Sequence, residues 1–234
     1  MEPVVSVITP VYNERRNLEE NIWRIERSLS EARIPFEIVV VDDNSPDGSG
    51  ALADEIAKRK TFVRVLHRPS KMGLGTAYKE AFPLTRGSLI VSMDSDLSHD
   101  PCFLPAMIGE AERVDIVIGS RFTGAGRIIG RSPLRDLLSI FANLAIRATT
   151  GTDIMDWTSG LRVYRRRVWE EIMPHVNCNK WDFQFESLYK ALGSGFTVRE
   201  VPITFYERAD GDSKFSLREA LGFIYSFLKV RLLE

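Results

Sequence analysis

SLIVSMDSD, residues 88–96, is a short apolar run that ends in two aspartates. Apolar side chains dominate positions 89–93, and Asp94 and Asp96 follow at once. A run of this length and character is typical of a strand buried on both faces of a parallel sheet. Ligands of open α/β sheets bind beyond the carboxyl ends of the strands. The stretch therefore predicts a buried strand that delivers two carboxylates to a binding site.

Similar apolar runs alternate with helical patterns on either side of this strand. Four further strands are predicted: VVSVITP at 4–10, EIVVVDD at 37–43, FVRVLH at 62–67 and DIVIGS at 115–120. Helices are predicted at residues 17–33, at 49–60, from about Gly73, and at 101–111. Strands that alternate with helices in this way indicate βαβ units. We therefore predict an α/β fold with a Rossmann-like, mostly parallel central sheet and flanking helices.

Two amphipathic helices are predicted in the second half of the chain, at 133–149 and 216–233. Their leucine and phenylalanine stripes are candidates for a membrane-facing surface, and ordinary packing on the sheet is the alternative for their inward faces. The longest uncharged run nearby, Ala220 to Leu228, is nine residues. A bilayer span needs about 20 apolar residues, so the chain is expected to lie on a membrane rather than cross one. We divide it into a catalytic domain at 1–215 and a C-terminal amphipathic helix at 216–234.

The composition excludes several classes of protein. A formal net charge of −1 gives no global field for nucleic acid, so attraction to phosphate or anionic lipid must come from local clusters. Cys102 and Cys178 have no CxxC spacing, which argues against a disulfide framework or a zinc site. The N-terminal MEPVVSVITPVYNE lacks the pattern of a signal peptide. We expect a cytoplasmic protein that is peripheral on the cytosolic face of a membrane.

The Asp94-Ser95-Asp96 sequence suits a divalent cation. Two carboxylates at a strand end can hold a cation, and a bound cation offsets the charge that a departing diphosphate gains. Oxygen ligands favour Mg²⁺ or Mn²⁺ over zinc. The alternative, a solvated turn whose aspartates cap a helix, is about equally good for this motif alone.

A second acidic turn follows the strand at 37–43. In DDNSPDG, residues 42–48, an acid just after the strand can accept hydrogen bonds from a base or a ribose. A turn with a helix N-cap explains the same residues equally well. The residues alone leave both interpretations open.

Seven strings in order resemble one family. They are PVYNE, DDNSPDGSG, KMGLGTAYKEA, MDSDLSHDP, GSRF, DWTSGLRVYRR and VPITFYERADGDSKF. Together they resemble the polyprenyl-phosphate mannosyltransferase branch of glycosyltransferase family 2, which includes the dolichyl-phosphate mannose synthases and has the GT-A fold. The resemblance covers nearly the whole chain. It implies a transferase that moves mannose from GDP-mannose to dolichyl or another polyprenyl phosphate.

The resemblance also implies roles for particular residues. The catalytic set is Asp94, Asp96, Arg121 and Arg135. The donor nucleotide is implied to contact Pro10, Tyr12, Glu14, Asp42, Asp43, Asp94, Arg208 and Lys214. The metal is implied to be held by Asp94, Asp96 and Ser98, where Ser98 replaces a glutamine common in relatives. The acceptor phosphate is implied to meet Arg121, Arg135 and Ser139. A solvated surface charge is the alternative interpretation of each arginine.

Three further segments carry candidates with simpler alternatives. The glycine-rich stretch at 71–76 either presents N–H groups to an anion or enters a helix, and we favour the helix entry. Trp157, with the two residues after it, either shapes the sugar end of the pocket or belongs to the core. Gln184 and Glu186 fall where many inverting relatives place a catalytic acid, and a helix-surface charge is the alternative for Glu186.

A phosphate acceptor simplifies the expected chemistry. With a second pKa of about 6 a phosphate monoester is largely dianionic near neutral pH, so it can attack the anomeric carbon without a general base. We therefore expect direct displacement with inversion, with GDP-mannose, the lipid phosphate and the membrane surface as partners. A membrane-anchored partner protein and a missing transmembrane segment are both left open. The alternatives are transfer from UDP-glucose or another UDP-sugar, and a non-catalytic nucleotide-sugar-binding module.

Overall fold

The structure, a computed structural model, describes residues 4–180 and 182–207. All five predicted strands are confirmed: β1 Val5–Val11, β2 Phe36–Asp42, β3 Val63–His67, β4 Leu89–Ser92 and β5 Ile116–Ser120. The predicted helices within the described residues are confirmed too: α1 Leu18–Glu31, α2 Ser49–Arg59, α3 Leu74–Ala81, α4 Leu104–Glu110 and α5 Pro133–Thr150. A 3-10 turn, Pro101–Phe103, leads into α4. The predicted helix at 216–233 lies outside the described residues, as do Arg208 and Lys214.

Several elements had no strand or helix prediction. They are β6 Arg127–Ile129, β7 Arg162–Arg165, α6 Arg166–Ile172, α7 Phe183–Gly193, β8 Val198–Pro202 and β9 Thr204–Tyr206. All four of these strands are three to five residues long, so their apolar pattern is too brief to read from the sequence.

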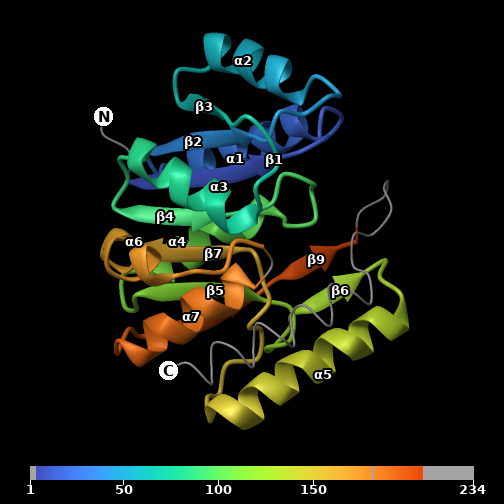
Figure 1. The fold of residues 1–234 in the computed structure, drawn as a ribbon, viewed down its shortest axis with the longest axis vertical. Helices are drawn as coiled ribbons and strands as arrows, with labels where there is room; N and C mark the ends of the chain where they lie inside the picture. The colour runs from blue at the N-terminus through green and yellow to red at the C-terminus, as the bar shows by residue number, and fades with distance from the viewer. Residues whose placement is uncertain (1–3, 181, 208–234) are drawn as a thin grey trace.

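The main sheet has the strand order β3-β2-β1-β4-β7-β5-β8. Its strands are parallel except β7, which runs antiparallel to both β4 and β5. The prediction of a mostly parallel sheet is therefore confirmed. Figure 1 shows the strands stacked from β3 near the top toward β5, with the small sheet of β6 and β9 and helix α5 at the lower right.

Both faces of the sheet are covered, which explains the continuous apolar strands. On β1, Val5 and Val7 point into one core cluster and Ile8 points into the other. The first cluster includes the apolar sides of α1, α2 and α4; the second includes those of α3, α6 and α7. A strand between two cores has apolar side chains in both directions, so alternation disappears from its sequence.

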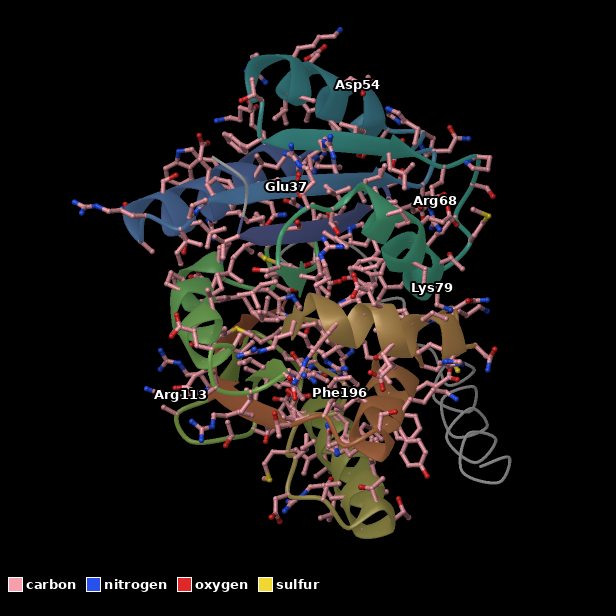
Figure 2. The ribbon with its side chains drawn as sticks, turned by 90° about the vertical axis from the view of Figure 1, so that its left-hand side faces the viewer. Glu37, Asp54, Arg68, Lys79, Arg113 and Phe196 are labelled. Atoms are coloured by element: carbon pink, nitrogen blue, oxygen red, sulfur yellow. The ribbon has the colours of Figure 1, made fainter. Side chains whose placement is uncertain are left out.

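A buried carboxylate ties the sheet together near the amino ends of β1 and β2. Glu37, labelled in Figure 2, is 1% exposed and accepts hydrogen bonds from Ser6 Oγ at 2.7 Å and from the Arg86 N–H at 2.6 Å. This end of the sheet is occupied by structural contacts. The polar strand ends predicted to form a site lie at the opposite, carboxyl end.

Candidate functional site

The two aspartates after β4 sit in a tight turn. Asp96 is 6% exposed, and its Oδ1 accepts hydrogen bonds from the Ser98 N–H at 3.0 Å and from Ser98 Oγ at 2.5 Å. Leu97, between them, has a φ of 64°, in the left-handed region. Ser98 therefore fixes the orientation of the Asp96 carboxylate.

Asp94 lies beside a space that only glycine leaves open. A Cβ added at Gly160 would stand 3.2 Å from Asp94 Oδ2. On another side, His99 Nδ1 lies 3.7 Å from the same oxygen, and His99 is 2% exposed. Within residues 4–180 and 182–207, no three His, Cys, Asp or Glu side chains converge as a metal cage. Two carboxylates that leave room for phosphate oxygens suit Mg²⁺, which is bound through one or two carboxylates plus substrate phosphates.

The acids after β2 are held by a basic neighbour. Arg68, labelled in Figure 2, is almost fully buried and donates from Nε to Asp43 Oδ1 at 2.6 Å. It also donates from Nη2 to the Gly73 carbonyl at 3.2 Å, so it connects the acidic turn to the start of α3. Burial raises the pKa of Asp43 above its ordinary value, and the hydrogen bond and charge of Arg68 oppose that rise. Asp42 is also buried, and its Oδ1 accepts from the Ser45 N–H at 3.2 Å.

The end of β1 lies against these acids. The parallel register pairs Val11 with Asp42 and Pro10 with Val41. The carbonyl of Pro10 accepts a hydrogen bond from Ser95 Oγ at 2.8 Å, which joins this strand end to the Asp94-Asp96 turn.

Tyr12 and Glu14 follow in the same loop. The Lys71 ammonium lies 4.5 Å from the centre of the Tyr12 ring. The Glu14 N–H donates to Ser49 Oγ at 3.0 Å. Among the described residues, the structure thus brings those predicted for the nucleotide to adjacent strand ends. Arg208 and Lys214 lie outside the described residues.

Arg121, at the end of β5, forms a buried ion pair. Its Nε and Nη2 donate to the Asp156 carboxylate at 2.8 and 2.7 Å, and Nη2 also donates to Thr158 Oγ1 at 2.6 Å. Burial lowers the pKa of Arg121, but the charge and hydrogen bond of Asp156, together with the charges of Asp136 and Asp94, outweigh burial, and the net pKa is raised. Burial raises the pKa of Asp156, and Arg121 reverses that change to give a net lowering.

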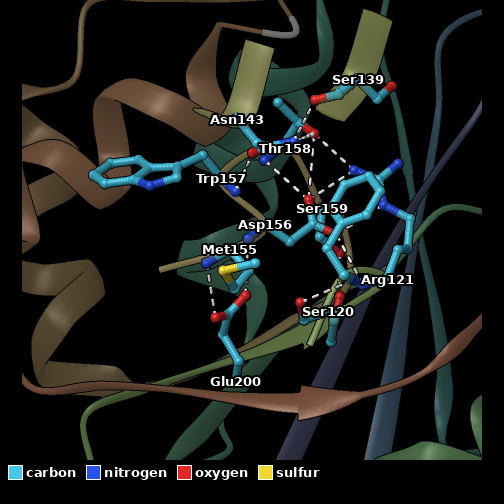
Figure 3. Close-up of polar contacts among 12 residues, drawn as sticks. Ser120, Arg121, Ser139, Asn143, Met155, Asp156, Trp157, Thr158, Ser159 and Glu200 are labelled. Atoms are coloured by element: carbon cyan, nitrogen blue, oxygen red, sulfur yellow. Dashed lines mark hydrogen bonds and ion pairs between the residues drawn. The ribbon is translucent and has the colours of Figure 1, made fainter. Parts of the chain in front are cut away.

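Figure 3 shows how this pair reaches helix α5. Thr158 Oγ1 lies 3.5 Å from Asn143 Nδ2, and Asn143 Nδ2 donates to the Ser139 carbonyl at 2.9 Å. The Asn143 carbonyl oxygen accepts from the Trp157 N–H at 2.7 Å. Ser139 is therefore connected to Arg121 through two intermediate side chains.

Arg135, at the start of α5, pairs with the residue that follows β9. Its Nη1 donates to Glu207 Oε1 at 2.8 Å. Arg131, in the loop before α5, lies 3.6 Å from Glu207 Oε2 and 3.7 Å from Asp136 Oδ1, measured from Nε. Burial and the charges of Arg121 and Arg135 lower the pKa of Arg131, whereas Glu207 and Asp136 oppose the change.

The acids and the arginines belong to one region. The ring of Phe205 lies 5.3 Å from the His99 ring and 5.5 Å from the Arg121 guanidinium carbon. His99 in turn borders Asp94, and the charge of Asp94 contributes to the raised pKa of Arg121. The site therefore has a carboxylate side at β4 and an arginine side at β5 and α5.

Comparison with known proteins decides the family. Residues 6–173 match the family model described as Glycosyl transferase family 2. The chain belongs to glycosyltransferase family 2. It is 43% identical over 224 residues to a polyprenol monophosphomannose synthase of Mycolicibacterium smegmatis, covering 92% of this chain and 83% of that protein. It is 37% identical over 216 residues to an undecaprenyl-phosphate mannosyltransferase of Micrococcus luteus, covering 91% of this chain and 87% of that protein.

Solved structures confirm the GT-A fold of this glycosyltransferase. A glucosyl-3-phosphoglycerate synthase from Mycobacterium tuberculosis, crystallised with Mn²⁺, UDP-glucose and phosphoglyceric acid, matches with a TM-score of 0.70. The identity is 19%, and the match covers 97% of this chain and 79% of that one. At this identity the likeness concerns the fold alone.

The structure favours the simpler alternative for Gly73 and Trp157 of this glycosyltransferase and contradicts it for Glu186. Glu186 is 2% exposed and accepts from the N–H groups of Asn177 and Cys178 at 2.9 and 2.6 Å, which anchors the loop before α7. It is therefore not a helix-surface charge. Gly73 has a φ of 108°, and a Cβ there would lie 2.2 Å from the Asn179 carbonyl oxygen, so close packing requires this glycine. Trp157 is fully buried in the core.

Sequence reasoning missed Arg131, Asp156, Arg68 and Glu207 as parts of the site. Arg131 lies shortly before the predicted helix at 133–149 and is one of several arginines in GRIIGRSPLRD. Nothing in that local pattern separates Arg131 from its neighbours. Its partner Glu207 is far away in sequence, and only the fold brings the two together.

Proposed function

We propose that this glycosyltransferase moves mannose from GDP-mannose to a polyprenyl phosphate such as dolichyl phosphate. The observation that carries the proposal is the facing arrangement of the two acids after β4 and the arginines of β5 and α5, joined through His99 and Phe205. The donor diphosphate and the acceptor phosphate are both anions, so their reaction needs a cation held by the acids on one side and arginines on the other. The names of the M. smegmatis and M. luteus relatives supply the sugar and the lipid acceptor.

The donor is assigned to the carboxylate side. Asp42, Asp43 and the Tyr12 loop lie at the adjacent carboxyl ends of β1 and β2, where they can bind a nucleoside. Arg68 keeps Asp43 oriented. Arg208 and Lys214 are assigned to the donor diphosphate by resemblance, and they lie outside the described residues. The choice of GDP over UDP belongs to this proposal.

Asp94 and Asp96 are assigned to a divalent cation, Mg²⁺ or Mn²⁺. Their oxygen-only chemistry fits, as does the room that Gly160 leaves beside Asp94. When bound, the cation offsets the negative charge that develops on the departing diphosphate. Ser98 holds Asp96 in its orientation through two hydrogen bonds. In this arrangement Ser98 can also supply an additional oxygen ligand.

The acceptor's phosphate is assigned to Arg121, Arg135 and Ser139. Guanidinium groups bind phosphate oxygens through directed N–H bonds, and Asp156 holds Arg121 in a fixed direction. A phosphate oxygen then attacks C1 of mannose. The bond from C1 to the diphosphate oxygen breaks, its electron pair leaves with GDP, and the configuration at C1 inverts. The dianionic nucleophile needs no proton removed, so no general base is assigned.

Helix α5 supports attachment to the membrane that contains the acceptor. Five apolar side chains on its outer face are between 48% and 58% exposed: Leu137, Leu138, Ile140, Phe141 and Leu144. A contiguous apolar stripe of this kind beside a phosphate site is suited to a lipid surface. No helix among the described residues is long and apolar enough to span a bilayer. We therefore propose that the protein binds peripherally to the cytosolic face of this membrane through α5.

A donor panel tests the proposed function. The full chain is incubated with Mn²⁺ or Mg²⁺, dolichyl phosphate in detergent, and radiolabelled GDP-mannose, UDP-glucose or UDP-N-acetylglucosamine in separate reactions. We expect transfer from GDP-mannose to give an acid-labile mannosyl lipid with β configuration. Transfer from a UDP-sugar instead would replace the donor in the proposal. Donor binding without any transfer would favour a nucleotide-sugar-binding module, and a covalent mannosyl-enzyme would contradict direct displacement.

A further inference from the structure

Arg131 is a partly buried arginine whose hydrogen-bonding capacity is incompletely used. Its side chain is 15% exposed and lies in the loop between β6 and α5. Among the described residues, its Nη1 is buried and has no hydrogen-bond partner. The carboxylates nearest its Nε, at 3.6 and 3.7 Å, lie beyond normal hydrogen-bond length. Buried polar atoms usually have a partner, so this guanidinium is arranged for one that arrives from outside.

Glu207 stands between Arg131 and the predicted acceptor arginine Arg135. It accepts a hydrogen bond from Arg135 Nη1 through Oε1 and faces Arg131 Nε through Oε2. The backbone fixes this position, because the Glu207 N–H donates to the Ile129 carbonyl at 2.8 Å where β6 and β9 pair. A single carboxylate is therefore shared between two guanidinium groups.

Three positive charges act on the same small region. The pKa of Arg131 is lowered by burial and by Arg121 and Arg135, which places all three guanidinium groups within each other's field. Asp156 neutralises Arg121 through two short hydrogen bonds. Arg131 and Arg135 have instead the shared Glu207 and the longer contact of Arg131 with Asp136. This half of the cluster is the less tightly neutralised one.

We propose that Arg131 is a third phosphate-binding arginine of the acceptor site, and that Glu207 is the counter-ion that the acceptor's phosphate displaces. The inference rests on the proposed function, since it assumes that a phosphate monoester enters here. A phosphate dianion carries more charge and more acceptor oxygens than a carboxylate, so it can satisfy both guanidinium groups at once. Until it arrives, Glu207 keeps Arg131 and Arg135 in place.

Arg131→Gln tests the binding role. We expect the KM for dolichyl phosphate to rise at least about tenfold, the loss typical of a charge-assisted hydrogen bond, while the KM for GDP-mannose stays within about twofold. Arg127→Gln is the matched control. It removes the same charge from the neighbouring strand β6, where Arg127 is exposed and donates to Thr204 Oγ1 at 3.3 Å. An unchanged acceptor KM in Arg131→Gln, or an equal rise in Arg127→Gln, would overturn the assignment.

Glu207→Gln tests the displacement. Glutamine keeps an oxygen for Arg135 but removes the competing charge, so we expect the acceptor KM to fall about three- to tenfold with kcat little changed. In the Arg131→Gln/Glu207→Gln double variant, the two effects should not add, because both act on the same ion cluster. A higher acceptor KM in Glu207→Gln would show that the carboxylate assists binding, and would overturn the displacement.

Direct binding separates this inference from the proposed function. Calorimetric titration with geranyl phosphate, a soluble monoester, and with inorganic phosphate measures the affinity of the arginine cluster for phosphate without any sugar transfer. We expect Arg131→Gln to weaken both ligands and Glu207→Gln to strengthen both, with geranyl phosphate bound more tightly than inorganic phosphate. If the proteins bind geranyl phosphate in this pattern but the wild type never transfers mannose, the proposed function fails, while the phosphate-binding role of Arg131 and the displacement of Glu207 stand. If mannose transfer proceeds and neither variant alters phosphate binding, the roles of Arg131 and Glu207 fail and the proposed function stands.

Discussion

Arg121 is fixed to Asp156 by two parallel hydrogen bonds, from Nε at 2.8 Å and from Nη2 at 2.7 Å. Asp156 is fully buried and also accepts from the Arg121 backbone N–H at 3.0 Å. The pair gives Arg121 a single direction beside Asp94, whose charge contributes to the raised pKa of Arg121. A residue predicted to be a phosphate contact is thus held by a carboxylate that the sequence did not single out.

Asp156→Asn should destabilise the protein strongly. The substitution leaves the Arg121 charge buried without its counter-ion, and breaking such a pair costs about 3–5 kcal/mol of unfolding free energy. Urea unfolding followed by circular dichroism measures the change. Asp153→Asn removes an equal charge at an exposed position nearby and should change stability by less than about 0.5 kcal/mol. Equal stability of the two variants would contradict the structural role of the pair.

The same pair predicts a pH dependence of stability. The pKa of Asp156 is lowered in the folded protein from an ordinary value of 3.8. A carboxyl whose folded pKa is depressed contributes stability above its unfolded pKa and loses it as the pH falls through the folded pKa. The difference in unfolding free energy between wild type and Asp156→Asn should therefore be largest at pH 6–7 and should decrease below about pH 4. A gap of constant size down to pH 3 would contradict this sign.

Asp94→Asn and Asp96→Asn should each reduce kcat/KM by about 10²–10³-fold, because each removes a negative ligand that the proposed cation needs. Transfer assays over a range of Mn²⁺ concentrations measure the loss, and tryptophan fluorescence checks folding. Asp153→Asn again serves as the charge-matched control and should retain full activity. Full turnover in the folded Asp94→Asn/Asp96→Asn double variant would remove the basis of the proposed mechanism.

The central sheet could be predicted because its signal is local. Each of the five predicted strands is a short run rich in apolar residues, and the structure places β1 to β5 at those runs. The polar ends of β1, β2 and β4 lie together, because these strands are neighbours and parallel in the sheet. β7 behaves differently. Its sequence, RVYR, begins with an arginine that is fully buried and donates to the carbonyls of Trp157 and Gln184. The Gln184 carbonyl comes from α7, an element that was not predicted, so no local pattern in RVYR could show that this charge is buried in a strand.

The same limit applies to the site. Asp94, Asp96 and Asp42 could be found because they stand at or just after the ends of predicted strands. Arg131 and Glu207 could not, because their proximity depends on the pairing of β6 with β9. Likewise, Arg68 is one of many arginines in the sequence, and its role depends on burial beside Asp43.

Arg68→Lys should weaken donor binding selectively. A lysine keeps the charge but cannot reach Asp43, Thr76 and the Gly73 carbonyl together as the guanidinium does. We expect the KM for GDP-mannose to rise about tenfold while the KM for dolichyl phosphate stays within about twofold. Arg64→Lys is the matched control, because Arg64 lies on β3, the strand that Arg68 directly follows, is exposed, and donates to the Leu84 carbonyl. If both substitutions raise the donor KM equally, Asp43 does not need Arg68 for its role.

The outer face of α5 should bind lipid directly. Leu137 and Phe141, 49% and 58% exposed, lie one helical turn apart, so Leu137→Ser/Phe141→Ser removes the centre of the stripe without disturbing the buried side chain of Ile146. Because membrane affinity scales with the apolar area that enters the interface, sedimentation with phosphatidylcholine–phosphatidylglycerol vesicles should fall at least about fivefold. Trp23→Ser is the control, since Trp23 is 46% exposed on α1, outside the stripe.

The soluble acceptor geranyl phosphate distinguishes membrane attachment from damage to the site. The α5 double variant should use it with a KM close to wild type, because Arg135 and Ser139 are unchanged, and should lose activity only toward dolichyl phosphate in vesicles. Equal losses toward both acceptors would indicate that α5 has shifted and has carried the phosphate-binding residues with it. Unchanged vesicle sedimentation would instead exclude the exposed stripe as the membrane-binding face. The two substitutions remove the apolar area that about two large side chains would bury in the membrane, and a loss of that size should be measurable.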